Sequence, residues 1–379
     1  MKILMLSIFA PHFFNWTEQL KDSGHEVYWL DIFDSNTRVE QIDFAEQIIG
    51  WRYKWNYPGR YFIKKNAPAL TRIINIFNER DLVKIFKEKL EEIQPDVVHS
   101  FVMSQAVFPI YEIMVAKPNI NWIYSSWGSD LYFYEDKGIA GKCIKRVLTR
   151  LDFMFSDCKR DYEIAKRNGF NGKFLGVFPG GGGFDFTKTD KWMKPFSERN
   201  IILIKGYQGK HGRCIEVLKA IQKNQISLSE KTIVIFGAHP EVFDFVSKKD
   251  LWFKDDLEIF NKIPHSEVIK LMGKSLIYIG NSVSDGMPNT LLEAIIMGVF
   301  PVQSNPGGAS EELIKQGENG LLISEPEDVN SLEESISMLF GENLNIKKGI
   351  NYNLEVIKPN LERAALRQKV LEKYKSIEK

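Results

Sequence analysis

The chain has 379 residues, of which 50 are basic and 49 acidic, and its net charge is +1. A nearly neutral chain has no overall field with which to collect nucleic acid, so we expect no nucleic-acid partner. The length is too great for one ordinary core and indicates two domains, and a hydrophobic content of 44% is typical of a folded protein.

The first apolar run, ILMLSIFA at residues 3–10, lacks a small-residue cleavage site and leads into Pro11, so we interpret it as a strand and not as a signal peptide. No segment approaches 18 uninterrupted apolar residues. The three cysteines, Cys143, Cys158 and Cys214, are odd in number and widely spaced, which favours packing roles in a reducing compartment. We therefore expect a cytoplasmic protein that could also work at the inner face of the membrane.

The N-terminal half of the chain alternates strand and helix patterns. Residues 2–10 predict a strand, 11–15 a loop, 16–23 a helix and 26–33 a second strand, which together form a Rossmann-like start. An amphipathic helix is predicted over 82–93, because its apolar residues lie on one stripe. Further strands are predicted at 96–101, 121–127, 151–156 and 174–178.

The segment from Trp51 to Lys65, residues 51–65, combines five cations and six aromatic side chains and has no acid. This mixture suits the headgroup layer of an anionic membrane, where each cation near the surface contributes on the order of 1 kcal/mol. The alternative is an exposed loop or helix whose aromatic rings pack inward. A peripheral membrane contact through this segment is therefore one hypothesis of two.

The second half repeats the alternation after the run PGGGGFD at residues 179–185, which we interpret as a hinge between domains or a close approach of backbone to ligand. Residues 201–213 begin the second strand–helix–strand domain. Strands are predicted at 232–237, 257–263, 275–280 and 299–304, and helices through 311–313 and over 360–375. His265 is interpreted as a surface residue and not as a catalytic one.

The loop after residues 275–280 is the most informative stretch. Its glycine and proline favour turns, and Thr290 with Glu293 forms a capping-box pattern that predicts a helix start at Thr290. A strand, a glycine loop and a helix N-terminus together form an anion site. Asp285 and Glu293 cannot both hold the anion, and a carboxylate near a diphosphate needs another task, so we expect them to accept hydrogen bonds from sugar hydroxyls. From spacing alone, a purely capping role for Glu293 remains open.

The stretch SDGMPNTLLEAIIMGVFPVQSNPGGASEELI, followed by GENGLLISEPED, resembles the signature of glycosyltransferase family 4, whose members are retaining enzymes. The resemblance implies an α/β chain of the GT-B fold, with two Rossmann-like domains whose parallel sheets face a central cleft. It further implies an acceptor-binding domain at 1–188, a nucleotide-sugar-binding domain at 189–355, and a C-terminal helix at 356–379 that crosses back.

The resemblance also assigns roles to residues on the donor side. Asp285 stands where the family has its first glutamate and would contact the donor hexose, while Glu293 would contact the ribose. The family's diphosphate-binding arginine is replaced by Tyr207, and we expect Lys210 and Arg213 to supply the positive charge that the leaving group needs. A solvated basic turn is the alternative. The remaining donor-binding candidates are Gly286, Met287, Pro288, Asn289, Thr290, Gly206 and Lys205.

On the acceptor side, the resemblance points to the strand end at residues 127–131. Trp127 occupies the place of a family histidine, followed by Gly128, and Asp130 is the acidic catalytic candidate, although it could also cap the next turn. His12 stands where the family usually has a glycine pair and joins the acceptor-side candidates.

Taken together, the resemblance implies transfer of a hexose from a nucleoside-diphosphate sugar to a saccharide or lipid-linked acceptor, with retention of configuration and without a metal or other cofactor. Cell-surface polysaccharide or glycolipid assembly is the expected setting. The alternatives are a sugar-nucleotide epimerase on the same scaffold and a non-catalytic nucleotide-binding protein. A glycoside hydrolase is disfavoured, because the two acids belong to a phosphate-type loop.

Overall fold

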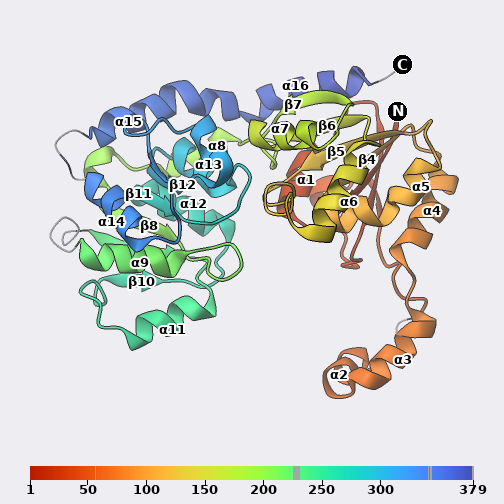
Figure 1. Ribbon diagram of the computed structural model, residues 1–379, viewed down its shortest axis with the longest axis horizontal. Helices are drawn as coiled ribbons and strands as arrows, with labels where there is room; N and C mark the ends of the chain where they lie inside the picture. Colours follow the sequence, from red (N-terminus) through yellow and green to blue (C-terminus); the bar gives the residue numbers. More distant parts are fainter. Residues whose placement is uncertain (56, 225–230, 340, 342–343, 378–379) are drawn as a thin grey trace. The chain divides into compact units, whose positions relative to one another are not determined.

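A computed structural model describes the chain except for residues 56, 225–230, 340, 342–343 and 378–379. The chain forms two compact units, and Figure 1 labels the elements of both. Unit 1 consists of Met1–Ser156, Tyr162–Gly182 and Lys369–Lys379, and unit 2 of Asp157–Asp161 and Gly183–Gln368. No helix in the described part of the chain is both long and apolar enough to cross a membrane.

Unit 1 is built on a parallel sheet of order β3-β2-β1-β4-β5-β6-β7. Its inner strands are buried almost throughout, as expected when helices cover both faces of a parallel sheet. The order reverses beside β1, and ligands bind at such a point beyond the carboxyl ends of the strands. The strands are β1 (Lys2–Ser7), β2 (Glu26–Asp31), β3 (Glu46–Ile48), β4 (Val97–Phe101), β5 (Asn121–Ser126), β6 (Phe153–Ser156) and β7 (Lys173–Val177).

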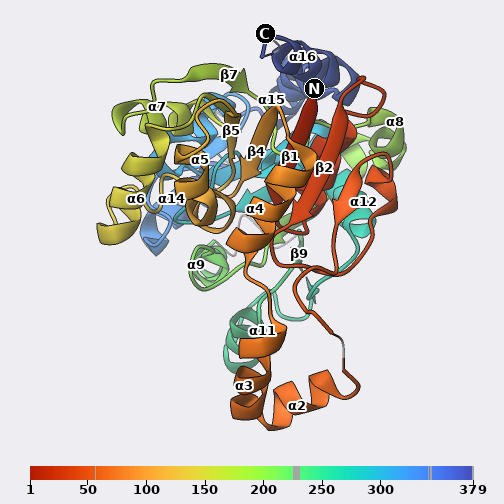
Figure 2. The ribbon, with the colours of Figure 1, turned by 90° about the vertical axis from the view of Figure 1, so that its right-hand side faces the viewer.

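The helices of unit 1 include α4, which matches the predicted amphipathic helix and lies over the sheet in Figure 2. Its buried residues Ile85, Phe86 and Leu90 share one apolar cluster with Leu4 and Val98 of the strands. The helices that begin in this part of the chain are α1 (Pro11–Glu18), α2 (Arg60–Asn66), α3 (Pro68–Asn78), α4 (Leu82–Ile93), α5 (Tyr111–Val115), α6 (Gly138–Leu148) and α7 (Lys159–Arg167), with shorter turns η1 (Glu40–Ile42), η2 (Met103–Val107) and η3 (Phe108–Ile110).

The prediction of a loop at residues 11–15 is wrong, because α1 starts at Pro11. A proline is favourable in the first turn of a helix, where its missing N–H would have had no partner. Phe13, Phe14 and Trp16 are buried on the inner side of this helix. Burial of these three rings outweighs the turn preference that the residues suggested on their own.

Unit 2 carries a second parallel sheet, of order β10-β9-β8-β11-β12-β13. Its strands are β8 (Ile201–Lys205), β9 (Thr232–Phe236), β10 (Leu257–Ile259), β11 (Ser275–Gly280), β12 (Phe300–Ser304) and β13 (Leu321–Ile323). Its helices are α8 (Phe186–Thr189), α9 (Cys214–Lys223), α11 (Pro240–Lys248), α12 (His265–Lys274), α13 (Asn289–Ile296), α14 (Val329–Met338) and α15 (Ile346–Tyr352), with turns η4 (Asp190–Trp192), η5 (Phe196–Glu198), η6 (Pro306–Gly308), η7 (Ser310–Glu312), η8 (Asn353–Ile357) and η9 (Lys358–Leu361).

The helix predicted through residues 311–313 is wrong, since only the short turns η6 and η7 form there. The side chain of Asn305 accepts hydrogen bonds from the backbone N–H groups of Ser310 and Glu311, at 3.0 and 3.2 Å. Gly307 and Gly308 both have positive φ, a backbone conformation that suits glycine and ends regular structure. The loop therefore keeps a fixed shape without a full helix.

The last helix, α16 (Arg363–Lys375), contributes to both units, because the division falls after Gln368. In unit 1, the Tyr374 hydroxyl accepts a hydrogen bond from Trp16 Nε1 at 3.2 Å and lies 2.6 Å from His99 Nδ1. The other ring nitrogen of His99 lies 2.8 Å from Ser125 Oγ. These buried contacts fix the C-terminal part of α16 in the core of unit 1.

The predicted glycine run contains the division between the units, which falls between Gly182 and Gly183. Both glycines have positive φ, and a Cβ on Gly183 would lie 2.5 Å from Leu366 of α16. The run is therefore glycine partly because α16 packs directly against its backbone. The division lies a few residues before the expected end of the first domain at residue 188.

Candidate functional site

Two loops of unit 2, at the carboxyl ends of the neighbouring strands β8 and β11, are fastened to each other by their backbones. Arg213 N–H donates to Asn281 O at 3.0 Å, and Val283 N–H donates to His211 O at 2.9 Å. A β-bridge also joins Gly212 to Ser282. The two stretches in which the sequence predicts donor-binding residues, 205–213 and 285–293, therefore meet at one edge of the sheet.

Lys205, at the end of β8, lies with its Nζ atom 3.7 Å from Asp285 Oδ2. The same ammonium group lies 4.7 Å from the centre of the Tyr207 ring, which in turn stacks on the His239 ring at 5.2 Å. Lys205 and Asp285 are both mostly buried, with 16% and 27% of their side chains exposed. Lys205 and Asp285 thus form a cation–carboxylate pair beside the stacked rings of Tyr207 and His239.

The start of α13 differs from the capping box that the sequence predicts, and that prediction is wrong. The helix begins at Asn289 after Pro288, and no side chain caps it. The Thr290 hydroxyl accepts a hydrogen bond from the Tyr278 hydroxyl at 2.8 Å, and Glu293 has a different partner. The backbone N–H groups of Leu291 and Leu292 donate to Pro288 O at 3.0 and 3.2 Å, and the positive end of the helix dipole at this start favours an anionic ligand.

Glu293 is buried, with 8% of its side chain exposed, on a helix whose remaining inner residues are apolar. Its Oε1 atom lies 2.6 Å from His265 Nε2, and this hydrogen bond raises the pKa of His265 above its ordinary value, against the opposing effect of burial. The sequence identified Glu293 as a site residue but treated His265 as an unrelated surface residue. Only the packing of α12 against α13 brings the two together.

Gly286 is required by the close approach of a carboxylate. A Cβ atom on Gly286 would lie 2.3 Å from Asp157 Oδ2, which is closer than real contacts allow. Asp157 belongs to the short segment Asp157–Asp161, which follows β6 in the chain but packs in unit 2. Next in the loop, the side chain of Asp285 accepts a hydrogen bond from Gly286 N–H at 3.0 Å.

The other loop residues differ in exposure in a way that defines the open side of the site. Met287 and Pro288 are buried, whereas Asn289 and Thr290 are partly exposed. Gly206, at the end of β8, is buried, and a Cβ there would lie 2.5 Å from Ala238 Cα. The half-exposed side chains of the helix start therefore form the surface that a ligand can reach.

The two cations expected to neutralise the diphosphate have different surroundings. Arg213 donates to Glu327 Oε1 at 2.8 Å and to the carbonyl oxygens of Gly209 and Gly212 at 2.6 and 2.8 Å. Its guanidinium group therefore holds the loop in shape. Lys210 lies in the same loop with its side chain exposed. Lys205 is the cation that faces Asp285 most directly.

The acceptor-side candidates lie in unit 1. The rings of His12 and Trp127 meet edge to face at 6.4 Å, and Trp127 packs on Phe101 at 4.7 Å. Gly128 follows with a φ of 58°. Asp130 accepts hydrogen bonds from Met103 N–H at 2.9 Å and from the Tyr124 hydroxyl at 3.1 Å, so its carboxylate fixes the local backbone.

Asp157, Cys158 and Asp161 are buried and bring potential metal-ligating atoms within 4.8 Å of one another. Asp161 forms an ion pair with Arg160 at 2.7 Å, and burial raises the pKa of the Cys158 thiol far above its ordinary value. A neutral thiol and a paired carboxylate are poor metal ligands. We interpret these residues instead as part of a buried charge cluster, in which Arg160 neutralises Asp161 beside the loop that carries Gly286.

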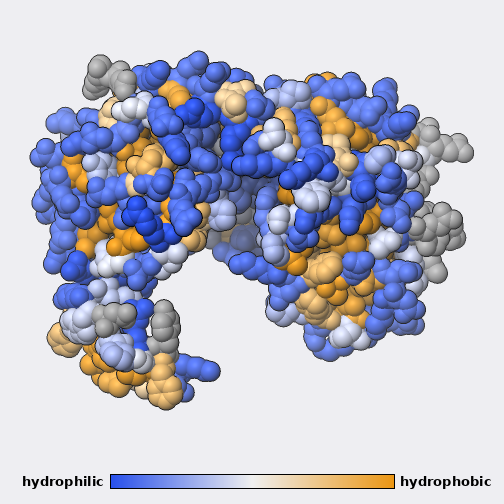
Figure 3. All heavy atoms as spheres, turned by 180° about the vertical axis from the view of Figure 1, so that it is seen from behind, coloured by the Kyte–Doolittle hydropathy of each residue, from blue (hydrophilic) through white to orange (hydrophobic). Residues whose placement is uncertain are grey.

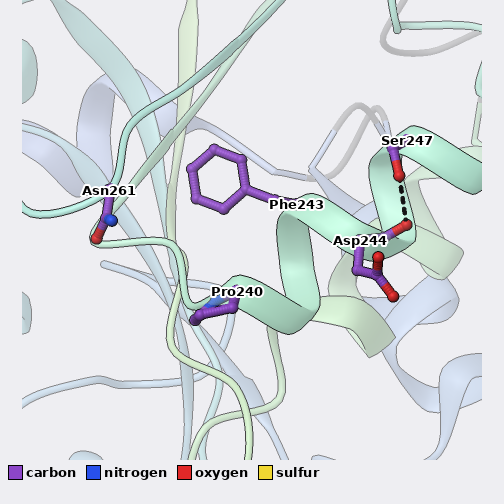
Figure 4. Close-up of a pocket in the computed structure, with 5 residues that line it drawn as sticks. All are labelled: Pro240, Phe243, Asp244, Ser247 and Asn261. Carbon is purple, nitrogen blue, oxygen red and sulfur yellow. Dashed lines mark hydrogen bonds between the residues drawn. The ribbon is translucent and has the colours of Figure 1, made fainter.

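A separate hollow of about 530 Å³ on unit 2 lies against α11, and Figure 4 shows the side chains that line it. The lining residues are Pro240, Phe243, Asp244, Ser247 and Asn261. It contains an acid and no cation, so its lining does not suit a diphosphate. The hollow shares no residue with the loops that carry Lys205 and Asp285.

Comparison with known proteins gives two family matches. The family described as "Glycosyl transferase 4-like" matches residues 2–158, and the family described as "Glycosyl transferases group 1" matches residues 186–353. No curated protein matches the chain.

Several solved structures share the fold over the whole chain. Sucrose-phosphate synthase from Thermosynechococcus elongatus is 14% identical, with a TM-score of 0.73, and the match covers 100% of this chain and 99% of that chain. HepE of Anabaena, in complex with UDP and glucose, is 12% identical with a TM-score of 0.69, covering 99% and 100%. A glycosyltransferase from Rickettsia africae is 16% identical with a TM-score of 0.67, covering 99% and 98%.

Proposed function

We propose that this chain, a glycosyltransferase of the GT-B fold, binds a nucleoside-diphosphate sugar in unit 2 and transfers its hexose, with retention, to a saccharide or lipid-linked acceptor. The observation that carries the proposal is the meeting of the β8 and β11 loops. It places Lys205, Asp285 and the uncapped start of α13 together, with Glu293 one turn further along the helix.

The pyrophosphate of the donor would bind at the start of α13. Backbone amides and the helix dipole favour a negative group at this position. Glu293 would accept hydrogen bonds from the ribose through the carboxylate oxygen that His265 leaves available. Asp285 would accept hydrogen bonds from the hexose. HepE of Anabaena, which shares the fold, has been solved with UDP and with UDP-glucose, and this supports a nucleotide sugar as donor.

Transfer breaks the bond between the anomeric carbon and the β-phosphate oxygen, and the electron pair leaves with the phosphate. The acceptor hydroxyl oxygen forms the new bond to that carbon, and its proton passes to the departing β-phosphate oxygen. The growing charge on the diphosphate requires fixed positive groups. Lys205 and Lys210 would supply them together with the helix amides, while Arg213 holds their loop in position. No metal ion is needed for this charge balance.

The acceptor would bind on unit 1, where the rings of Trp127 and His12 offer apolar faces and a polar edge of the kind that carbohydrates contact. Gly128, next to Trp127, has a φ of 58°, a backbone conformation that suits glycine. Retention follows from the resemblance to the family and not from this geometry. The acceptor's chemical class, a saccharide or a lipid-linked saccharide, is proposed on the same basis.

The test begins with thermal-shift measurements against UDP, GDP, dTDP and ADP, followed by assays with the matching sugar donors in the presence and absence of acceptors. We expect one nucleoside diphosphate to raise the melting temperature, and we expect donor cleavage that requires an acceptor and continues in EDTA. Turnover without acceptor would indicate an epimerase. Binding without any turnover would indicate a non-catalytic nucleotide-binding protein, and loss of activity in EDTA would contradict the metal-free charge balance.

A further inference from the structure

Helices α2 and α3 form an arm on unit 1 that stands away from the sheet in Figures 1 and 2. Its base is fixed, because Lys54 N–H donates to Asn78 O at 2.9 Å and Arg80 N–H donates to Arg52 O at 2.7 Å. Arg52 also pairs with Glu79 at 2.5 Å. The arm is therefore attached rigidly at one end, and its helices extend from that attachment.

The arm reverses the usual pattern of a surface helix. The buried residues of α3 are polar, Thr71 and Asn78, whereas its exposed residues are largely apolar. Soluble helices place the apolar stripe inward and the polar residues outward. The exposed apolar side chains, with the exposed fraction of each residue, are Trp55 49%, Phe62 70%, Leu70 47%, Ile73 58%, Ile76 73% and Phe77 65%.

These side chains place apolar surface along the arm, and Figure 3 shows hydrophobic atoms on it. Leu70, Ile73 and Phe77 follow one another at helical spacing and share a face of α3, with Ile76 beside them. Exposed apolar residues scattered singly need no explanation, but a group of this size on one small element indicates a binding surface.

The charge of the arm identifies its partner. The two helices of the arm, residues 60–78, contain four basic residues, Arg60, Lys64, Lys65 and Arg72, and no acid. Lys64, Lys65 and Arg72 are exposed on the helices, and the Arg60 guanidinium lies 4.1 Å above the ring of Tyr53. The same arm on a second copy would carry the same positive charge, so self-association through this surface is disfavoured. Apolar side chains flanked by cations match the interface of an anionic lipid bilayer.

We propose that the α2–α3 arm, residues 60–78 together with Trp55, docks on anionic membranes by placing its apolar face among the lipid headgroups and its cations beside the phosphates. The surface differs from the one that the sequence indicates at residues 51–65. Trp51 is buried and donates its Nε1–H to Asp31 O at 2.8 Å, and most of the exposed apolar area lies on α3. The inference does not depend on the proposed transfer reaction.

The experiment is flotation of the full chain with vesicles of phosphatidylcholine alone and with vesicles that also contain phosphatidylglycerol. We expect the wild-type chain to float only with the anionic vesicles, and less at high salt. The triple variant Ile73→Ser, Ile76→Ser and Phe77→Ser should reduce recovery at least about tenfold, and Lys64→Glu with Lys65→Glu should reduce it similarly. A matched control, Met338→Ser with Val356→Ser, replaces exposed apolar residues of unit 2 and should float like wild type.

A second readout locates the contact on the arm. Brominated lipids quench tryptophan fluorescence at short range, and we expect the quenched component to disappear in Trp55→Phe, a variant that keeps an apolar ring on the arm. Equal flotation of wild type and both arm variants would overturn the proposal, as would equal quenching in wild type and Trp55→Phe. A dimer in sedimentation that the triple variant abolishes, without any vesicle binding, would instead assign the apolar surface to a second copy.

Discussion

His265 Nε2 lies 2.6 Å from Oε1 of Glu293, the buried carboxylate of the first turns of α13. A carboxylate in apolar surroundings is costly unless a hydrogen bond or a charge compensates it. His265, whose side chain is 69% exposed, provides this compensation from the solvent side and uses one of the two carboxylate oxygens. The pair therefore fixes the direction of the oxygen that remains for a ligand.

We expect His265→Ala to weaken nucleotide binding by roughly threefold to tenfold, because Glu293 loses the partner that orients it. His265→Gln keeps a donor at about the same reach and should lose less. Calorimetric titration of both variants with the nucleoside diphosphate that binds wild type checks the expectation. Unchanged affinity in His265→Ala would show that Glu293 needs no orientation, or that the nucleotide binds elsewhere.

The hydrogen bond between His265 and Glu293 should make the stability of the fold depend on pH. The folded-state pKa of His265 is raised, chiefly by its hydrogen bond to Glu293, so the stabilisation is complete below the unfolded value of about 6.5 and is lost as pH rises through the folded value. The melting temperature of wild type should exceed that of His265→Gln most at about pH 6, and the gap should narrow in alkaline buffer. A gap that widens with pH would contradict the pairing.

Substitutions of Glu293 and Asp285 should have different effects, the first on donor binding and the second on turnover. Glu293→Gln removes the carboxylate that would accept hydrogen bonds from the ribose hydroxyls. This change should weaken binding of the sugar nucleotide about tenfold or more. Asp285→Asn should lower turnover by about a hundredfold while changing donor affinity little, because Asp285 would contact the reacting sugar. Steady-state kinetics combined with nucleotide titration distinguishes the two. Wild-type activity in either variant would refute its place in the site.

Lys205 and Arg213 offer a matched comparison of two mostly buried cations in one loop region, with 16% and 17% of their side chains exposed. Lys205→Met should lower turnover by about a hundredfold and leave the melting temperature almost unchanged, since its ion pair with Asp285 is long at 3.7 Å. Arg213→Met removes bonds to two carbonyl oxygens and Glu327, and should lower stability by about 1–3 kcal/mol. The reverse pattern would assign the diphosphate contact to Arg213.

The sequence predicted the elements with strong periodicity well and the site contacts only in part. The strand at residues 275–280 and the helix at 82–93 have the bounds that periodicity indicates, because each has a continuous buried face. The pattern Thr290-x-x-Glu293 does not form the capping box that it predicts, since local spacing cannot show that Tyr278 and His265 bind those side chains. The close approach of Asp157 to Gly286 could not be predicted from the sequence, because the two residues lie far apart in the chain.

The stability of unit 1 should fall in acid because of His99. Its ring is fully buried between Tyr374 and Ser125, and burial lowers the pKa of His99 well below its ordinary value. The unfolded chain takes up a proton below about pH 6.5 that the folded chain does not, so stability falls by about 1.4 kcal/mol per pH unit below that point. Urea denaturation across this pH range measures the free energy of unfolding. In His99→Gln, the slope of this free energy against pH should be smaller by the contribution of one proton.

Gly286→Ala tests the close approach of Asp157 to the donor loop. The added Cβ would lie 2.3 Å from Asp157 Oδ2, so either the loop or the carboxylate must move. We expect a loss of stability of about 1–3 kcal/mol and nucleotide binding weakened about tenfold, because the displaced loop carries Asp285 and the start of α13. Asp157→Ala removes the clashing oxygens, so the double variant should recover part of both losses.

This rescue separates a steric effect from a general defect of the loop. The coupling between Gly286→Ala and Asp157→Ala, measured in a double-mutant cycle, should be large for both stability and binding, since the two positions touch directly. Gly317→Ala is the matched control, because Gly317 lies in another loop of unit 2 where an added Cβ meets nothing within 4 Å. Its positive φ makes alanine costly for stability, but nucleotide binding should be retained. Additive effects of the Gly286 and Asp157 changes would show that the carboxylate does not press on the loop in solution.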